Sequence, residues 1–201
     1  MIFSTSEQDG RDNYQLLNGG VTPRPIAWIS TRSKKGVDNL APFSFFTVAS
    51  GNPPVLLYTQ ITQRSGLDKD TLQNLIETHE CVVNIVSPDL IEKMNMTSAS
   101  IPAHESEFSF ANVESCASAS VEPLSVKASP VRYECSLREI VHISDLPAGG
   151  KIILLDVKSV YVRDDLFSDG KIDQKKFSTV GRLSGNFYGV FPEKIEIIRP
   201  G

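Results

Sequence analysis

Short apolar runs separated by polar, turn-forming stretches are the main pattern along the chain. Runs of strand length that are rich in β-branched residues are typical of buried β-strands. We assign such strands to PIAWIS from Pro25, PVLLYT from Pro54, CVVNIV from Cys81 and IILLDVKSVYV from Ile152. VRYECSL from Val131 alternates strictly between apolar and polar residues, which predicts a strand with one buried face. The polar TRSKKGVDN has the size of a hairpin connection, with Gly36 available for a positive φ.

Helical periodicity is confined to two stretches. In DKDTLQNLIETHE, an apolar stripe at helical spacing consists of Leu72, Leu75, Ile76 and His79, so we expect His79 to be packed. Asp70 followed by Gln73 predicts a capping box at the start of this helix. SPDLIEKMN predicts a second, short helix, with Ser87 as its cap and Pro88 at its first position.

Many strands and few helices favour a mainly β fold, either an antiparallel barrel or a sandwich. No internal repeat and no Ser/Gly linker divides the 201 residues, so we expect one domain over residues 1–201. A doubly wound dinucleotide fold is excluded, because the chain lacks regular strand–helix alternation and a G-x-G-x-x-G turn.

The stretch NLAPFSFF contains an interrupted strand, because Asn39 and Pro42 are poor strand residues among three phenylalanines. By itself it favours an aromatic core with a bend at Pro42. The alternative is a binding strip, in which Asn39, Ser44 and main-chain groups lie beside apolar surface. A flavin or a similar heterocycle requires that mixture of polar and apolar groups.

Three other stretches offer polar groups to a ligand. The helix start LDKDT combines Lys69 and Thr71 with unpaired N–H groups that suit a phosphate, although the local sequence alone favours a plain Asp70 cap. Arg24 is held between two prolines in TPRPIAW, either as a presented guanidinium or as a simple strand entry. GRLSGNFYG, which contains Arg182, has glycine spacings that match no P-loop.

Composition narrows the chemistry further. A net charge of −4, with no basic run longer than Arg32 to Lys35, argues against nucleic acid as the partner. The chain has no membrane-length apolar run, and MIFSTSEQDGRD lacks a signal-peptide core, so we expect a cytoplasmic protein. Three scattered cysteines suggest no disulfide framework. His104, Glu105 and Glu107 match no zinc spacing, so we expect a solvated loop there and no metal site. No classical catalytic set is present, so a cofactor would supply the reactivity.

The order of the motifs is more specific than any one of them. YQLLNGGVTPRPIAWISTRSKKGVDNLAPFSFFTVASGNPPVLL, KDTLQN and CVVNIV, followed by SEFSFA, SPVRYECSL and VGRLSGNFY, closely resemble the flavin reductase-like, flavoredoxin-type family of FMN-binding split-barrel proteins. The resemblance runs from about Tyr14 to Tyr188. It implies a Greek-key split β-barrel that is usually a homodimer, with FMN near the subunit interface.

The resemblance also implies where FMN binds. The phosphate and ribityl chain correspond to two segments: Ser30, Thr31 and Arg32, then Lys69, Asp70, Thr71 and Asn74. The isoalloxazine corresponds to the strip Asn39, Ala41, Ser44, Phe45 and Phe46. Arg182 and Tyr188 match the late block and reach the same pocket or its twin across the dimer.

The implied activity is that of an FMN-dependent oxidoreductase, a reductase that takes hydride from NADH or NADPH. Reduced flavin then passes electrons to free flavin, a metal complex or a protein acceptor. No residue is assigned as a catalytic acid or base. The main alternative is a flavoredoxin-like electron-transfer protein, carrier or sensor without NAD(P)H turnover. A bare structural barrel, a pyridoxamine-phosphate oxidase-like enzyme and a haem- or deazaflavin-binding relative also stay open.

Overall fold

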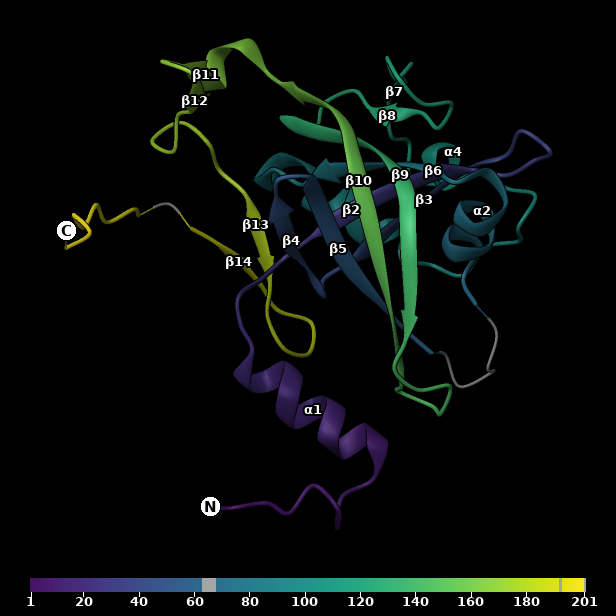
Figure 1. The fold of residues 1–201 in the computed structure, drawn as a ribbon, viewed down its shortest axis with the longest axis vertical. Coiled ribbons are helices and arrows are strands. Elements are labelled where there is room, and N and C mark those ends of the chain that lie inside the picture. Colours follow the sequence, from purple (N-terminus) through teal and green to yellow (C-terminus); the bar gives the residue numbers. More distant parts are fainter. Residues whose placement is uncertain (63–67, 192, 201) are drawn as a thin grey trace.

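The computed structural model describes residues 1–62, 68–191 and 193–200, and a large antiparallel sheet forms its body (Figure 1). The strand order is β3-β2-β6-β9-β10-β5-β4, so β3 and β4 are the edges and hydrogen bonds do not close the sheet among the described residues. The strands are β2 (Ala27–Arg32), β3 (Asp38–Phe43), β4 (Phe46–Gly51), β5 (Pro54–Ile61), β6 (Glu80–Ile85), β9 (Val131–His142) and β10 (Gly150–Val162).

Smaller elements surround this sheet. The short strands are β1 (Arg24–Pro25), β7 (Ser115–Cys116), β8 (Ser125–Val126), β11 (Phe167–Ser168), β12 (Lys171–Ile172), β13 (Val180–Arg182) and β14 (Tyr188–Val190). The helices are α1 (Gly10–Gly20), α2 (Asp70–Thr78), α3 (Ile91–Met96) and α4 (Glu107–Phe110), with 3₁₀ turns η1 (Pro88–Leu90) and η2 (Asp164–Leu166). None of the helices in the described ranges is long and apolar enough to cross a membrane.

The predicted strands are confirmed, and Gly36 in the β2–β3 hairpin has a φ of 81°. The expectation that β9 exposes its polar face is wrong at Glu134. That side chain is only 6% exposed, because its carboxylate accepts hydrogen bonds from the backbone N–H groups of Ala119 and Ser120.

Two hydrophobic cores lie on opposite sides of β2, because successive side chains of a strand point to opposite faces. Ala27 and Ile29 belong to the core under α2. Trp28 belongs to the second core, which includes residues of α3 and α4, and its Nε1 donates to Thr97 Oγ1 at 2.9 Å. Because β2 is covered on both faces, every residue from Ala27 to Ser30 is inaccessible to water.

Helix α2 differs from its prediction at both ends. Lys69 is the N-cap, with a ψ of 152° and no side-chain cap bond, and Asp70 is the first helical residue, so the capping box is wrong. His79 ends the helix at a φ of 61° and is exposed, because it leaves the helical stripe. Ile76 is 46% exposed. The second predicted helix is split into η1 and α3; Ser87 precedes it as the N-cap without a side-chain bond.

Helix α1 was not predicted. Asp9 caps it by accepting the N–H groups of Arg11 and Asp12 at 2.7 and 2.8 Å. Its apolar residues Leu16 and Leu17 are exposed, so the helix buries no apolar face of the kind that periodicity detects. In Figure 1 it lies below the main sheet, beside the tip of the β9–β10 hairpin and the β13–β14 loop.

The interruption in NLAPFSFF lies two residues later than expected. Pro42 continues β3, where it pairs with Trp28 on an edge strand that tolerates a residue without an N–H group. The bend falls at Ser44 and Phe45, between β3 and β4. Phe43 is therefore buried, whereas Phe45 is half-buried beside the open side of the bend.

Candidate functional site

A buried polar cluster joins β2, β3, α2 and α4, with Asn39 at its centre. Asn39 Oδ1 accepts from Thr71 Oγ1 at 2.8 Å and from Thr31 Oγ1 at 3.3 Å. Asn39 Nδ2 donates to both carboxylate oxygens of Glu107 at 3.0 Å. Asn74 Nδ2 donates to Thr31 Oγ1 at 3.1 Å. The antiparallel pairing of Thr31 with Asn39 brings these groups under the start of α2.

A polar cavity of about 220 Å³ opens beside this cluster at the start of α2. The first N–H groups of a helix lack intrahelical partners, and the helix dipole makes this end attractive to anions. The 97–101 segment adds three hydroxyl-bearing residues to the lining. The lining consists of Asn39, Ala41, Asp68, Lys69, Asp70, Thr71, Thr97, Ser98, Ala99, Ser100, Ile101 and Glu107.

Lys69 supplies the cationic charge of this cavity. Its Nζ lies 4.9 Å from the centre of the Phe43 ring and makes no hydrogen bond or ion pair with another described residue. Removal from water lowers the pKa of Lys69 below its usual value. By contrast, the neighbouring Asp68 is neutralised by Lys151 at 2.8 Å. A desolvated ammonium at a helix start is suited to a bound anion.

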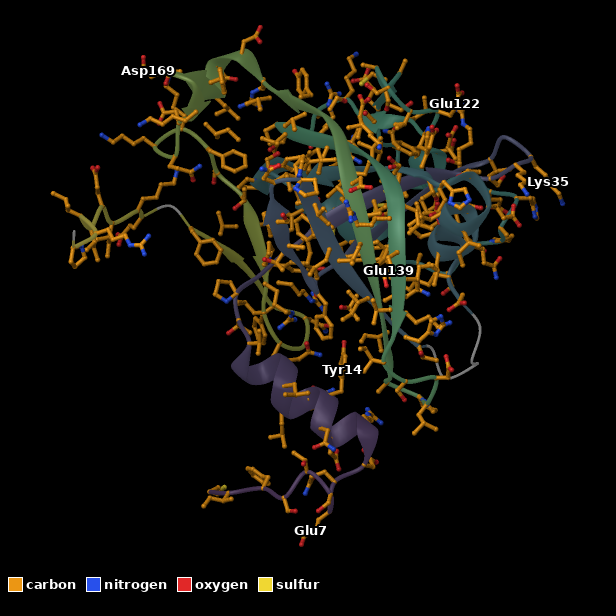
Figure 2. The ribbon with its side chains drawn as sticks, viewed as in Figure 1. Glu7, Tyr14, Lys35, Glu122, Glu139 and Asp169 are labelled. Atoms are coloured by element: carbon orange, nitrogen blue, oxygen red, sulfur yellow. The ribbon has the colours of Figure 1, made fainter. Side chains whose placement is uncertain are left out.

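The aromatic strip continues from the polar cavity along β3 and around its bend. Lys69 also lines a larger cavity of about 650 Å³, together with Phe43, Ser44 and Phe45. Tyr14 of α1 closes this space from the other side, with its ring 6.1 Å from that of Phe45. Figure 2 shows Tyr14 directed from α1 toward the body of the molecule.

A further apolar cleft of about 770 Å³ lies between α1, the β9–β10 hairpin and the strip. It is lined by Phe45 and Phe46 from the strip and by Leu17 and Leu146 opposite them. The polar cavity at the start of α2 and the apolar surface at the Ser44–Phe45 bend therefore both border the edge strand β3. This sequence of surfaces matches an elongated ligand with an anionic end and a flat heterocyclic end.

Two arginines lie at the far end of the strip. Arg24 donates to the carbonyl oxygens of Asn18, Val21 and Leu183 at 2.8, 2.7 and 2.9 Å, and burial lowers its pKa. These bonds tie the end of α1 and the β13–β14 hairpin to β1.

Arg182, the register partner of Arg24, lies over the ring of Tyr188 at 4.4 Å. The hydroxyl of Tyr188 donates to Asn95 at 2.9 Å. Arg182 and Tyr188 line a cavity of about 180 Å³ with Ser44, so the late block does reach the strip.

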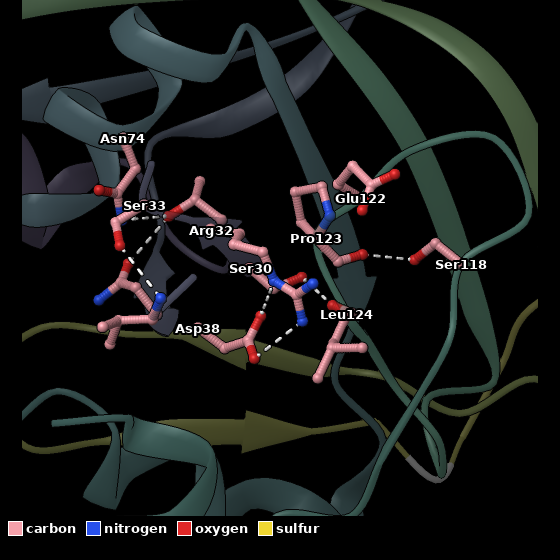
Figure 3. Close-up of polar contacts among 12 residues, drawn as sticks. Ser30, Arg32, Ser33, Asp38, Asn74, Ser118, Glu122, Pro123 and Leu124 are labelled. Carbon is pink, nitrogen blue, oxygen red and sulfur yellow. Dashed lines mark hydrogen bonds and ion pairs between the residues drawn. The ribbon is translucent and has the colours of Figure 1, made fainter. Parts of the chain in front are cut away.

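Ser30 and Arg32 are not brought into the polar cluster (Figure 3). The Ser30 hydroxyl donates to the carbonyl oxygen of Leu124 at 2.5 Å, on the opposite face of β2 from Thr31. Arg32 forms a two-pronged ion pair with Asp38 at 2.8 and 3.1 Å, which closes the hairpin and raises the Arg32 pKa.

The sequence did not indicate Glu107 and Tyr14 as candidate site residues, and it left two interpretations of Arg24 open. The expectation of a solvated loop at residues 104–107 is wrong for Glu107, which is buried, although His104 is exposed. The one available signal was the position of Glu107 directly before the apolar Phe108. In the described residues, no group of three His, Cys, Asp or Glu side chains is arranged to hold a metal.

Comparison with known proteins identifies the family. The model of the flavin reductase like domain matches residues 19–179. The chain belongs to the flavin reductase-like family. An uncharacterized protein of Halalkalibacterium halodurans is 38% identical over 197 residues, which cover 94% of this chain and 92% of that protein.

Solved structures agree with the family. Nitrilotriacetate monooxygenase component B from Bacillus cereus is 31% identical, with a TM-score of 0.92 and 98% of each chain covered. A Shewanella frigidimarina protein with a split barrel domain, assigned as a flavin reductase, has a TM-score of 0.84 at 23% identity, with each chain fully covered. The predicted mainly β, split-barrel fold is therefore confirmed.

Proposed function

We propose that this family member is an FMN-dependent oxidoreductase that takes hydride from NADH or NADPH. The acceptor of its electrons is free flavin, a metal complex or a partner protein. The proposal covers residues 1–201 as one domain, working as a homodimer in the cytoplasm. The observation that carries it is the succession along β3 of a cationic helix start, a polar cavity and an aromatic strip.

The residues at the helix start fit the phosphate and ribityl chain of FMN. Lys69 and the N–H groups of the first turn of α2 suit a phosphate. The carboxylate of Asp70 and the hydroxyls of the 97–101 segment suit the polar chain that follows. Thr31 and Asn74 do not line the cavity, and Thr31 bonds to both Asn74 and Asn39 of the lining, which holds this wall in place.

The strip fits the ring system. Phe45 and Phe46 cover apolar surface, while Ala41 leaves room beside the backbone and Ser44 adds a hydroxyl. Arg24 and Arg182 place positive charge at the same end, which suits the negative charge that a flavin acquires on reduction. When bound, FMN supplies the capacity to accept hydride and to release electrons singly or in pairs. The chain's own tasks are binding, orientation and exclusion of water, and no described residue is assigned as a proton donor.

Exposed apolar residues support the homodimer. Ile195, Ile197 and Ile198 are between 83% and 90% exposed in the extended C-terminal segment, which lies away from the main sheet in Figure 1. A contact with a second subunit would remove these side chains from water, which supports the proposed homodimer.

The visible spectrum of the purified protein tests the proposal, followed by anaerobic addition of NADH and then of NADPH. We expect flavin absorption, after incubation with FMN if necessary, that bleaches rapidly with one of the nucleotides. Flavin absorption that persists with both nucleotides favours a flavoredoxin-like carrier or sensor. A protein that binds no FMN contradicts the proposal altogether.

A further inference from the structure

Glu107 is the member of the polar cluster whose presence needs a separate explanation. Its side chain is 6% exposed, and it forms no ion pair with a described residue. Burial raises the pKa of Glu107 above its usual value, and the carboxylate of Asp70 on α2 raises it further. The hydrogen bonds to Glu107 lower its pKa, but they do not outweigh burial. A buried anion without a cation costs folding free energy.

Three hydrogen bonds connect this carboxylate to the start of the strip. Asn39 Nδ2 lies 3.0 Å from both oxygens, and the backbone N–H of Leu40 donates to Oε2 at 2.9 Å. The Leu40 N–H lies on the free edge of β3, since alternate residues of an edge strand turn their N–H groups away from the neighbouring strand. Glu107 thus takes the place of a neighbouring strand at this point.

The carboxylate also sets the direction of every hydrogen bond in the cluster. An ionised carboxylate only accepts, so the amide nitrogen of Asn39 must face Glu107. The amide oxygen of Asn39 then faces α2 and accepts the hydroxyl protons of Thr71 and Thr31. Thr31 in turn accepts from the Asn74 amide. The chain of donors and acceptors therefore runs one way, from α2 to α4.

We propose that Glu107 is a positioning residue of the flavin site: its carboxylate holds Asn39 and Leu40 in place and thereby joins β3 to the start of α2. This inference rests on the proposed flavin-binding function. It assigns Thr71 a specific part, because the single hydroxyl proton of Thr71 is donated to Asn39 and is not available to a phosphate. The donors that face an anion are then Lys69 and the backbone N–H groups.

Exchanging the two amide and acid side chains tests this assignment. Glu107→Gln alone turns an NH₂ group toward Asn39 or Leu40, and Asn39→Asp alone sets two carboxylates against each other. The double variant restores complementarity, since the introduced glutamine donates to the introduced aspartate and still accepts the Leu40 N–H. The measurement is the Kd for FMN, from quenching of flavin fluorescence, together with the melting temperature of each FMN-free variant.

We expect each single variant to weaken FMN binding by about tenfold or more, and the double variant to return within about threefold of the natural protein. Glu134→Gln is the matched control, because Glu134 is also 6% exposed but lies outside the cavities. It is expected to lower the melting temperature without changing the Kd for FMN by more than about twofold.

Unchanged FMN affinity in both single variants, or a double variant no better than either, overturns the inference while the flavin-binding proposal stands. Failure of the natural protein to bind FMN overturns both. If Glu107→Gln does not fold, Glu107→Asp replaces it, because it keeps the charge but shortens the reach by one methylene. That variant is expected to weaken FMN binding by about tenfold, and an unchanged Kd overturns the positioning role.

Discussion

Ser30 and Thr31 are neighbours in the sequence, yet their side chains belong to two different polar clusters on opposite faces of β2. On the Ser30 side, buried polar side chains bond mainly to backbone groups. Asn84 donates to the Trp28 carbonyl oxygen at 2.9 Å and accepts from the Val126 N–H at 2.8 Å. Glu134 accepts two backbone N–H groups at 2.8 and 2.6 Å.

On the Thr31 side, side chains bond mostly to one another and border a cavity. Asn39, Thr71 and Glu107 all line the polar cavity, whereas neither Asn84 nor Glu134 lines any of the cavities described above. Polar groups that bond to the backbone join segments of the fold. Polar groups that bond to each other beside a cavity can hold a binding surface in one geometry, which is the difference that marks the candidate site.

The largest effect on stability is expected from Asn84→Ala. It leaves the Val126 N–H buried without its partner and removes the side-chain bond to the Trp28 carbonyl oxygen, which we expect to lower the free energy of unfolding by about 3 kcal/mol. The measurement is urea unfolding. Asn74→Ala is the matched variant on the site side, with an expected loss of about 1 kcal/mol, because Asn74 donates to one hydroxyl. Equal losses contradict the distinction between the two clusters.

Lys69→Ala is expected to affect binding instead of folding. Loss of a charge-assisted contact to phosphate raises the Kd for FMN by about 30-fold, equivalent to about 2 kcal/mol. The free energy of unfolding is expected to stay the same or rise, because burial disfavours the ammonium. Lys127→Ala serves as control, since Lys127 is exposed and pairs with Glu114 at 3.1 Å. A Kd that changes equally in both variants contradicts the phosphate assignment.

The two buried glutamates are expected to give opposite pH dependences, of smaller size. Burial raises the pKa of Glu107 in the folded protein above its pKa in the unfolded chain. The free energy of unfolding therefore falls as the pH rises from the unfolded-state pKa through the folded-state pKa. Burial also acts on Glu134, but backbone hydrogen bonds outweigh it and lower its pKa. Glu134 therefore stabilises the folded protein at pH values above its unfolded-state pKa. This stabilisation is lost as the pH falls through its folded-state pKa.

Urea unfolding between about pH 3 and pH 7 measures both slopes around the ordinary glutamate pKa. Glu107→Gln is expected to remove the loss of stability at rising pH, and Glu134→Gln to remove the loss at falling pH. The same change of slope in both variants contradicts the difference in pKa direction.

The smallest effect is expected from Arg32→Ala. The Arg32–Asp38 pair is partly exposed and closes a hairpin, so its removal is expected to cost about 0.5 kcal/mol. Because Arg32 lies outside the polar cluster, we expect the Kd for FMN to change by less than about threefold. A tenfold weaker affinity would instead assign Arg32 to the phosphate, as family resemblance implies.

Local pattern was sufficient for the strands, for the body of α2 and for the positive φ of Gly36, because these depend on period-two or helical spacing and on turn geometry. The order of motifs was also sufficient for the family. The resemblance also assigned Lys69 and Thr71 to the phosphate and Asn39 to the isoalloxazine, and this assignment stays a prediction.

Only the tertiary structure decided which neighbours face the same way and which polar residues are buried. Strand alternation separates Ser30 from Thr31, and the 119–120 segment covers Glu134 although its strand pattern predicts exposure. Arg24 holds the C-terminal end of helix α1 by donating to the carbonyl oxygens of Asn18 and Val21. The helix has no buried apolar stripe, so its periodicity did not predict it. Glu107 gains its place from contacts with Asn39 and Leu40, 67 residues or more away, and contacts at that separation leave no local signal.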